Sequence, residues 1–544
     1  MSGRGPGPLV CIPAAGRGTR MGFADGALHK ALAPLSNRAV LTHVLESFPP
    51  DARFVIALGH RADQLRAYLA LAHPDRDITL VAVDNYAGPA SGPGLSILAC
   101  AEHLTEPFAL AAADAVVHDL PALEGSSWMG VSHVEDPTAY LTLEVDAAHH
   151  VRRFQERTGP SQLAYVGVAW ITEPAVYLDG LRAVVPSGEH QATAGFQALV
   201  DARVPIRALP CDWTDTGTTE TYAAARARFA ETVSGGRAPT DVTYLLPGRV
   251  VKWFRDPDGA RRRVLRAADL RAAIPPVIPA PPGWLAYEKA EGAVLRDRLG
   301  AGEVREVLDW IDDALWEERA DGASFRAAAR RFYGEKTLAR LGAYLDDRGI
   351  SEQPSGTEVN GVPTATVAEA LERELEPLVA AAVPARFHGD LHEGNIVAGP
   401  GGYRLIDWRD EFGGLADRGD QLYDLAKLVH TLELPESVMQ ARAFQITHAA
   451  DGAIGFGHPD SPLRAEGRRA FWDWCAAREL DLRAIGALDA LVWINMAPLY
   501  DRELGDYFYA FGRWLLELRH RGDGSPQSEA ALIPQLRGTP ATGA

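Results

Sequence analysis

The first part of the chain alternates short apolar runs with amphipathic segments. The apolar runs predict buried strands at residues 9–15, 54–59, 78–84 and 108–114, and the amphipathic segments predict helices at 62–73 and 94–104. This alternation is typical of a doubly wound α/β domain, so we expect such a domain over residues 1–233. A predicted helix over 218–233 closes it, and residues 234–240, rich in Gly, Ala and Pro, have a linker's composition.

Length, charge and cysteine usage exclude several classes of protein. The chain has 544 residues, too many for one core, and a formal net charge of -18 that argues against nucleic acid or an anionic membrane surface as a partner. Its four cysteines are far apart in the sequence, which excludes a zinc site or a disulfide framework and favours reduced thiols in a cytoplasmic protein. With no apolar signal segment and no run of about 18 uncharged apolar residues, we expect no membrane span. The sequence gives no indication of oligomeric state.

A glycine-rich turn directly follows the first predicted strand. Residues 14–21 have the sequence Ala-Ala-Gly-Arg-Gly-Thr-Arg-Met, whose glycines let backbone N–H groups approach phosphate oxygens closely. A dinucleotide-binding turn would need Gly or Ala in place of Met21, and a P-loop would need Gly-Lys-Ser/Thr. The turn therefore indicates a phosphate site of another kind, unless it is only a glycine-rich turn.

This turn, with Lys30 in the sequence Leu-His-Lys-Ala-Leu, resembles the nucleotidyltransferases that make activated sugars and alcohols. The resemblance implies that the triphosphate is bound by the turn and that Lys30 neutralises charge at the α-phosphate. The residues assigned to the turn on this basis are Ala15, Gly16, Gly18, Thr19 and Arg20, the last also with a catalytic role.

Two aspartates are candidates for a magnesium site in this domain. Asp114 ends a predicted buried strand, and ligands in open α/β sheets bind beyond the carboxyl ends of the strands. The segment Asp-Trp-Thr-Asp-Thr-Gly-Thr over 212–218 resembles the Trp-x-Asp-x-Gly-Thr segment of the same enzymes. The resemblance implies that Asp215 is the second Mg²⁺ ligand. Taken alone, Asp215 could equally cap the helix that begins near Thr219.

The nucleobase is indicated only weakly. By resemblance, the segment 85–94 contacts the base, with Asn85, Ser91 and Gly92 as nucleotide-binding candidates, although it departs from the Gly-Thr-Ala form of the sugar enzymes. His29 before Lys30 is closer to phosphocholine cytidylyltransferases, which favours CTP. UTP or dTTP is the alternative.

The clearest chemistry lies near residue 390. Residues 386–395 read Arg-Phe-His-Gly-Asp-Leu-His-Glu-Gly-Asn, and 403–408 read Tyr-Arg-Leu-Ile-Asp-Trp. Phosphoryl transfer needs metal ions on the phosphates and a carboxylate that orients the acceptor hydroxyl. Asp390 can be that carboxylate, and Asn395 and Asp407 can hold Mg²⁺. A loop with capping Asp and Asn side chains would explain each residue singly but not the ordered set.

The two motifs resemble the aminoglycoside phosphotransferase and choline kinase family. The resemblance implies a two-lobed, protein-kinase-like α+β domain, with an upper lobe at 241–290 and a helical lobe at 291–522; residues 523–544 have the composition of a disordered tail. Lys252, on a predicted strand, is then expected to bind the ATP phosphates, unless it only protects an edge strand. The predicted hinge over 284–292 includes Glu288 as a nucleotide-binding candidate, and Asp269 is the available partner for Lys252.

The acceptor is suggested by acidic and aromatic residues after Trp408. A cation such as choline, ethanolamine or an aminoglycoside would be held by carboxylates and ring faces together. The residues concerned are Asp410, Glu411, Asp417, Asp420, Asp424, Trp472, Trp474, Trp493, Tyr500, Tyr507 and Tyr509. Aromatic residues at helical spacing are more often core, and we favour core over cage.

Together these features predict a bifunctional enzyme with two Mg²⁺-dependent sites. The C-terminal domain would phosphorylate a small choline- or ethanolamine-like alcohol with ATP, and the N-terminal domain would transfer a nucleotidyl group from an NTP, preferably CTP, to that phosphate. One alternative is a sugar or cyclitol kinase fused to a sugar-1-phosphate nucleotidyltransferase. Another is one active domain with a nucleotide-sensing pseudoenzyme.

Overall fold

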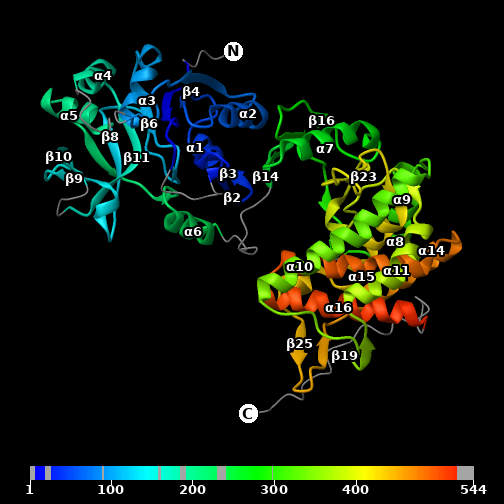
Figure 1. The fold of residues 1–544 in the computed structure, drawn as a ribbon. Coiled ribbons are helices and arrows are strands. Elements are labelled where there is room, and N and C mark those ends of the chain that lie inside the picture. Colours follow the sequence, from blue (N-terminus) through cyan, green and yellow to red (C-terminus); the bar gives the residue numbers. More distant parts are fainter. Residues whose placement is uncertain are drawn as a thin grey trace. The chain divides into compact units, whose positions relative to one another are not determined.

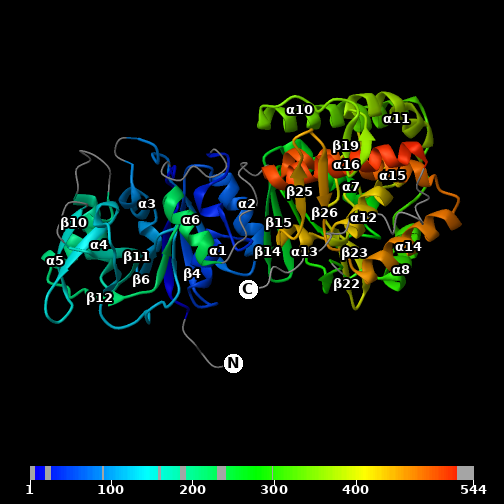
Figure 2. The same ribbon diagram turned by 90° about the horizontal axis from the view of Figure 1, so that it is seen from below.

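The structure is a computed structural model, and it describes residues 6–18, 26–88, 91–156, 161–183, 191–229, 241–296 and 298–522. These residues form two compact units, one of residues 1–233 and 238–255 and one of residues 234–237 and 256–544. Figure 1 and Figure 2 label the helices and strands of both units. The predicted linker at 234–240 and the predicted tail at 523–544 lie outside the described residues.

The first unit is built on a nine-stranded mixed sheet. Its parallel part has the order β6-β1-β4-β5, and the order continues from β6 through antiparallel β11 to β9 and β10, with β8 pairing β11 and β12. The strands are β1 (Leu9–Pro13), β4 (Arg53–Leu58), β5 (Asp77–Ala82), β6 (Phe108–Ala111), β8 (Trp128–His133), β9 (Leu141–Val145), β10 (Val151–Glu156), β11 (Leu163–Ile171) and β12 (Arg207–Pro210). Because the chain runs from β1 to β4 on one side and returns to β6 on the other, the loop after β1 lies at a switch point of the sheet.

Six helices and several short elements complete the first unit. The helices are α1 (Val40–Glu46), α2 (Ala62–Ala72), α3 (Pro93–Ala99), α4 (Pro174–Ala183), α5 (Thr193–Asp201) and α6 (Thr219–Arg228). The short elements are η2 (Lys30–Leu32), β2 (Pro34–Leu35), β3 (Arg38–Ala39), η3 (Ala101–His103), β7 (Ala115–Val117), η4 (Pro137–Ala139) and β13 (Trp213–Asp215). Each strand and helix predicted for this region is present, but the helices predicted at 94–104 and 218–233 end earlier, at Ala99 and Arg228.

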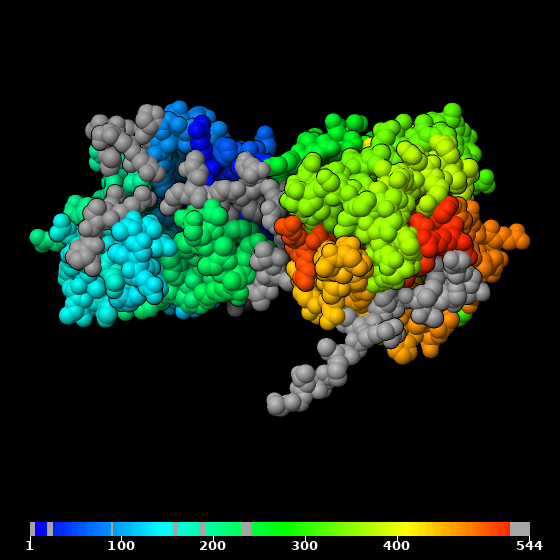
Figure 3. All heavy atoms as spheres, turned by 60° about the horizontal axis from the view of Figure 1, so that its bottom comes forward, coloured from blue at the N-terminus to red at the C-terminus, as the bar shows by residue number. Residues whose placement is uncertain are grey.

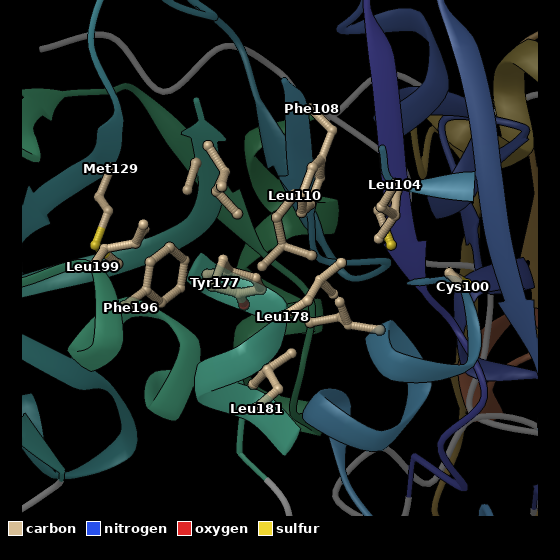
Figure 4. Close-up of a cluster of buried hydrophobic side chains, with 14 of the residues drawn as sticks. Cys100, Leu104, Phe108, Leu110, Met129, Tyr177, Leu178, Leu181, Phe196 and Leu199 are labelled. Atoms are coloured by element: carbon tan, nitrogen blue, oxygen red, sulfur yellow. The ribbon is translucent and has the colours of Figure 1, made fainter. Parts of the chain in front are cut away.

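One face of the sheet packs against α4 and α5. Figure 4 shows Phe108 and Leu110 of β6 directed toward Tyr177 of α4 and Phe196 of α5, all of them at most 4% exposed. The Tyr177 and Phe196 ring centroids are 5.1 Å apart in an edge-to-face arrangement. This apolar layer fixes β6, whose carboxyl end leads to Asp114.

The hairpin predicted for the upper kinase lobe is present, and by its contacts it groups with the first unit. Its place in the upper lobe stays a prediction. It consists of β14 (Asp241–Leu246) and β15 (Arg249–Phe254). The Tyr244 hydroxyl donates to the Leu32 carbonyl at 2.5 Å, and its ring lies 4.8 Å from that of Tyr68. The Arg249 guanidinium also donates to the Leu71 carbonyl at 2.9 Å. These contacts explain why the units divide at residue 255 rather than before residue 241.

The second unit begins with small strands and continues as a helical lobe. Its helices are α7 (Pro257–Leu270), α8 (Ala301–Ala314), α9 (Ala323–Arg330), α10 (Lys336–Arg348), α11 (Val367–Ala381), α12 (Gln421–Glu433), α13 (Glu436–Gln440), α14 (Pro462–Ala477), α15 (Leu482–Met496) and α16 (Arg502–Arg521). Its strands are β16 (Val277–Ile278), β17 (Trp284–Glu288), β18 (Ala293–Val294), β19 (Thr357–Val359), β20 (Val362–Thr364), β21 (Pro384–Ala385), β22 (Ile396–Gly399), β23 (Gly402–Leu405), β24 (Gly419–Asp420), β25 (Gln445–His448) and β26 (Ile454–Gly457).

The core of the helical lobe lies around α12, α15 and α16. The last two pack side by side in both ribbon views (Figure 1, Figure 2), and nearly every residue of α12 is buried. Figure 3 shows the same region as spheres. The red residues, which come late in the described chain, are visible only in patches between yellow-green and orange residues. The stretch Leu482–Leu499 is long and apolar enough to cross a membrane, but 72% of it is buried inside the fold, as in the core helix of a globular protein.

Candidate active sites

The glycine-rich turn follows β1 at the switch point of the sheet. Ala15 is fully buried, and its carbonyl accepts a hydrogen bond from the His60 backbone N–H at 2.9 Å, which ties the turn to the end of β4. Gly18 has a φ of +64°, and a Cβ there would lie 2.6 Å from the Lys30 side chain, so both conformation and space require glycine. Gly16 is exposed, with open space around its Cα. Thr19 and Arg20 lie outside the described residues.

Lys30 is placed by the residue before it. His29 caps the short 3₁₀ helix η2: its Nδ1 accepts from the Ala31 N–H at 3.1 Å, and its Nε2 donates to the Ala14 carbonyl at 3.2 Å. Burial and the nearby Lys30 charge lower the pKa of His29 to about 3, so the ring is neutral. His29 is 1% exposed and therefore has a positioning role, which accounts for its presence without reference to a nucleobase.

The three residues predicted for nucleotidyl transfer converge. Lys30 Nζ lies 2.6 Å from Asp114 Oδ2, in a pair whose side chains are 19% and 20% exposed. Asp215 is brought to the same place because β13 pairs with β7 and sets Asp215 opposite Ala115. A Cβ on Gly217 would lie 3.1 Å from Asp215 Oδ1 and 3.6 Å from Asp114 Oδ2, so both carboxylates face one small space.

Asp215 does not cap the following helix. Its Oδ1 accepts from the Gly217 N–H and its Oδ2 from the Tyr140 hydroxyl, both at 2.9 Å. The cap of α6 is Thr218, whose side chain accepts from the Thr221 N–H in a capping box. The capping alternative is therefore wrong, and Asp215 remains directed at Asp114. Tyr140, a distant residue that orients Asp215, carried no local sequence signal.

The segment predicted to contact the base lies beyond β5, beside the turn. The Tyr86 ring contacts the position that a Gly59 Cβ would occupy, at 2.7 Å, next to the Ala15 carbonyl. Asn85 is exposed, and Ser91 and Gly92 are half-buried immediately before α3. The three lie at the same sheet edge as the turn, and their contact with a nucleotide stays a prediction.

In the second unit, the loop that carries Asp390 and Asn395 joins β21 to β22. Asn395 Nδ2 donates to the Asp390 carbonyl at 2.9 Å, and the Ile406 N–H donates to the Asn395 carbonyl at 2.9 Å. The second bond holds Asn395 beside Ile406, which follows β23 and directly precedes Asp407. With its amide nitrogen used, the Asn395 side-chain oxygen is the group available to a cation. Asp407 has a φ of +62°, a strained conformation that clusters at functional positions, and accepts from the Tyr287 hydroxyl at 3.1 Å.

Buried polar residues hold this loop in shape. Asp424, on α12, accepts from the backbone N–H groups of His388 and Gly389, both at 2.7 Å, and burial raises its pKa to about 6. The His388 ring nitrogen Nε2 donates to the Ile406 carbonyl at 2.9 Å, and burial lowers the pKa of this ring to about 4. Asp424 therefore connects the loop to α12, and His388 connects it to the segment that follows β23.

A lysine on α12 pairs with the predicted catalytic acid. Lys427 Nζ lies 2.9 Å from Asp390 Oδ1, and the Asp390 side chain is 37% exposed. Burial alone would raise the pKa of Asp390, but the charges of Lys427, His392 and Arg409 outweigh it and hold that pKa well below its usual range. Asp390 is therefore ionised at neutral pH. Lys427 was not predicted as a site residue, although it is one of only five lysines in the chain.

The nucleotide-binding candidates of the kinase half lie on strands β15 and β17. Lys252 is 7% exposed on β15 of the first unit, and Glu288 is exposed at the end of β17. Both stay predictions as nucleotide ligands. Asp269 Oδ1 accepts from Arg319 at 2.8 Å, so the proposal that it substitutes as the partner of Lys252 is not supported.

Most of the acidic and aromatic residues noted after Trp408 are buried or paired within the fold. Asp420 and Asp424 are fully buried acceptors of backbone N–H groups, and Asp410 pairs with Arg262 at 2.6 Å. The aromatic residues are core, as favoured, with Tyr500 the exposed exception at 42%; those at most 5% exposed are Trp472, Trp474, Trp493, Tyr507 and Tyr509.

Two family models match the chain, one in each half. Residues 10–125 match the MobA-like NTP transferase domain, and residues 255–459 match the phosphotransferase enzyme family. The chain joins a MobA-like NTP transferase domain to a phosphotransferase-family domain. The predicted fold class, a Rossmann-like nucleotidyltransferase domain followed by a phosphotransferase-family domain, is confirmed. No curated protein matches the sequence.

The solved structures similar to the chain each match less than half of it. A UDP-glucose pyrophosphorylase complexed with UDP-glucose is 19% identical, with 41% of this chain and 98% of that chain covered at a TM-score of 0.37. The inositol-1-phosphate CTP transferase from T. maritima is 15% identical, with 43% and 100% covered at 0.35. A putative glucose-1-phosphate thymidylyltransferase from Bacillus anthracis is 15% identical, with 42% and 97% covered at 0.33.

The residues of both domains suit Mg²⁺ bound together with phosphates. Among the described residues, no group of three or more His, Cys, Asp or Glu side chains is arranged to hold a metal by itself. Mg²⁺ is commonly held by one or two carboxylates, waters and substrate phosphates. In the MobA-like domain Asp114 and Asp215 face one space, and in the phosphotransferase domain Asp407 and the Asn395 side-chain oxygen are the corresponding donors.

Proposed function

We propose that the protein phosphorylates the hydroxyl group of a small molecule with ATP and then joins that phosphate to a nucleoside monophosphate taken from an NTP. The observation that carries this proposal is the presence, in one chain, of two assembled sites with a lysine–aspartate pair each, Lys30–Asp114 and Lys427–Asp390. One pair lies beside a glycine-rich turn at the edge of an α/β sheet, the other in a phosphotransferase loop.

In the phosphotransferase domain, Asp390 would orient the acceptor hydroxyl and accept its proton. Lys427 supports the orienting role because it keeps the carboxylate ionised and able to accept a hydrogen bond from the hydroxyl. Asn395 and Asp407 would hold Mg²⁺, which supplies charge neutralisation on the transferred phosphoryl group. The hydrogen bonds from Asn395 and from Tyr287 fix both donors before substrate binds.

In the MobA-like domain, Lys30 would stabilise the negative charge that develops at the α-phosphate. An NTP phosphate would compete with Asp114 for the Lys30 ammonium, and the released Asp114 carboxylate would then bind Mg²⁺ together with Asp215. The turn around Gly16 and Gly18 would approach the phosphates through its backbone, because no side chain stands in the way. The acceptor phosphate attacks the α-phosphorus, and pyrophosphate leaves.

The choice of nucleotide and acceptor is less well supported than the reaction types. The preference for CTP came from His29, and its capping role explains that residue without a base. CTP is still the first donor to test, with UTP, GTP and dTTP beside it. Most of the acidic and aromatic residues that favoured a choline-like acceptor are buried or paired in the fold. The sugar or cyclitol alternative therefore stays open.

Two separate assays of the full-length protein test the proposal. The first measures acceptor-dependent ADP formation from ATP with a pool of amino alcohols, sugars, cyclitols and hydroxy acids. The second measures pyrophosphate release from each NTP with the phosphorylated members of the same pool. We expect both activities, with one compound common to both. Nucleotidyl transfer only to compounds that the phosphotransferase domain cannot make would contradict a sequential function.

A further inference from the structure

Several cationic side chains lie around the catalytic loop of the phosphotransferase domain on the side formed by α10 and α12. Lys427 pairs with Asp390, and Arg409 Nε donates to the carbonyl of Gly389, the neighbour of Asp390, at 3.1 Å. Lys336 begins α10, and its Nζ lies 3.8 Å from the centre of the Phe332 ring. The Arg409 guanidinium approaches the same ring at 5.3 Å. A single aromatic side chain therefore connects Lys336 to the loop.

The carboxylates near this group are Asp390, Asp410 and Glu411, and Asp410 is paired with Arg262. Asp390 is already paired with Lys427, and the nearby Asp424 is buried with its oxygens on backbone N–H groups. Within the described part of the chain, Lys336 and Arg409 form no ion pair with any carboxylate. Burial and the charges of Arg409, Arg340 and Lys427 lower the pKa of Lys336 well below its usual range, because together they outweigh the nearby Asp390. At Arg409 burial is outweighed by Tyr423, Asp390, Asp410 and Glu411, which raise its pKa.

The backbone that presents Lys336 is also unusual. A π-helical turn, η5 (Arg331–Glu335), interrupts the helix between α9 and α10 and ends directly before Lys336. π-turns of this kind occur frequently at functional sites, because the inserted residue changes the direction of the side chains that follow. Here the turn places Phe332 against the Tyr423 ring of α12 at 4.9 Å, and Lys336 lies over both rings, 5.8 Å from the centre of Tyr423.

Lysine is scarce in this protein, with five in 544 residues, while arginine supplies nearly all other positive charge. Two of the five, Lys336 and Lys427, lie in this group, which we call the cationic group together with Arg409. In a chain with a net charge of -18, a local excess of positive charge beside a partly exposed Asp390 would attract anions and repel cations.

We propose that the acceptor phosphorylated by this domain carries an anionic group, a carboxylate or a phosphate, which binds the cationic group while its hydroxyl reaches Asp390. This inference rests on the proposed kinase function and specifies its substrate class. It replaces the choline- or ethanolamine-like acceptor expected from the sequence, because a fixed positive charge on the substrate would be placed next to Lys336 and Arg409.

Matched acceptors of the full-length protein test this inference. Each set contains one carbon skeleton in several charge states: glycerol, glycerate and glycerol 3-phosphate; glucose, glucuronate and glucose 6-phosphate; and ethanolamine and choline as cations. We expect kcat/KM for at least one anionic member to exceed that of its neutral counterpart by about tenfold or more. The carboxylate and phosphate arms identify which anion is preferred.

Variants of Lys336 connect the preference to this group. Lys336→Gln should raise KM for the anionic acceptor about tenfold and leave KM for ATP unchanged, while Lys336→Arg should restore most of the loss. Arg469→Gln, which removes an exposed positive charge from α14 of the same unit, is the matched control. An equal rise in KM for ATP with every acceptor would overturn the inference, because the lysine would then be binding nucleotide.

The outcomes separate this inference from the proposed function. Faster phosphorylation of choline, ethanolamine or a neutral polyol than of every anionic compound would overturn the inference and leave the kinase function standing. Absence of acceptor-dependent ADP formation with all classes would overturn both. If Lys336→Gln does not fold, the wild-type ranking and the Lys336→Arg variant still decide the question.

Discussion

The two domains each contain a lysine–aspartate pair, but the pairs are built in different ways. In the MobA-like domain both partners lie at the edge of a sheet and are about equally exposed, at 19% for Lys30 and 20% for Asp114. In the phosphotransferase domain the lysine is a helix residue only 10% exposed, and the aspartate is 37% exposed. An ammonium that can leave its partner suits a role in binding substrate phosphate, whereas a buried one suits control of the charge on a fixed carboxylate. Similar pairs therefore serve different steps.

Loss of Asp390 should impair only one of the two activities, the ATP-dependent phosphorylation. Asp390→Asn keeps the shape of the side chain but removes the carboxylate, so ATP-dependent phosphorylation should fall by roughly 10²-fold or more. Pyrophosphate release from an NTP with a presupplied phosphorylated acceptor should be unchanged. Asp417→Asn, which removes the charge of an exposed carboxylate in the same domain, is the control. An unchanged phosphorylation rate in Asp390→Asn would remove this residue from its proposed role.

The reciprocal variant addresses the MobA-like domain. Lys30→Met should lower nucleotidyl transfer by about 10²-fold, the scale for losing one group that stabilises charge in the transition state. Phosphorylation by ATP should continue at the wild-type rate, measured as ADP formation with the same protein preparation. Arg66→Met removes an exposed positive charge from α2 and controls for net charge. Nucleotidyl transfer that survives in Lys30→Met would contradict the assignment.

The buried carboxylate behind the phosphotransferase loop should affect stability. Asp424→Ala leaves the N–H groups of His388 and Gly389 without their acceptor and should destabilise this domain by about 2 kcal/mol in denaturant unfolding. Because burial raises the pKa of Asp424 from 3.8 to about 6, the folded state takes up a proton first as the pH falls. The stability advantage of the wild type over this variant should therefore grow between about pH 6 and pH 4. Asp417→Ala should show neither effect.

The smallest expected effect concerns the helix after Asp215. Thr218→Ala removes the capping box of α6 and should destabilise the MobA-like domain by about 1 kcal/mol. Nucleotidyl transfer measured well below the unfolding temperature should change little, because Asp215 is held by Gly217 and Tyr140 and not by the cap. A loss of activity as large as that of Lys30→Met would show that the cap positions Asp215 after all.

Local patterns predicted the elements and the motif residues, and failed where distant segments decide the outcome. The strand predicted at 54–59 is β4 at Arg53–Leu58, because apolar runs are local information. The helix predicted at 94–104 ends at Ala99, where a 3₁₀ turn begins at Ala101. Hairpin β14–β15 was predicted from its local pattern and is present, but that pattern did not indicate that Tyr244 packs against Tyr68.

The same distinction holds for the sites. Lys30, Asp114, Asp215, Asn395 and Asp407 were found because each lies in a short motif or at the end of a predicted strand. Lys427 and Tyr140 were missed since only tertiary packing brings them to Asp390 and Asp215. The scarcity of lysine was the one signal that could have identified Lys427 and Lys336. Asp420 and Asp424 were counted among carboxylates that could hold a cationic acceptor, because sequence alone does not show that they are buried.

The central claim is that one chain transfers a phosphoryl group and then a nucleotidyl group to the same acceptor. It is tested most directly with full-length protein, ATP labelled with ¹⁸O in its γ-phosphate, each NTP in turn and the acceptor pool, followed by mass spectrometry of the nucleotide-linked products. The account predicts a product in which the phosphate next to the acceptor carries the label from ATP. A nucleotide-linked product without that label, or phosphorylated compounds that are never joined to a nucleotide, would contradict it.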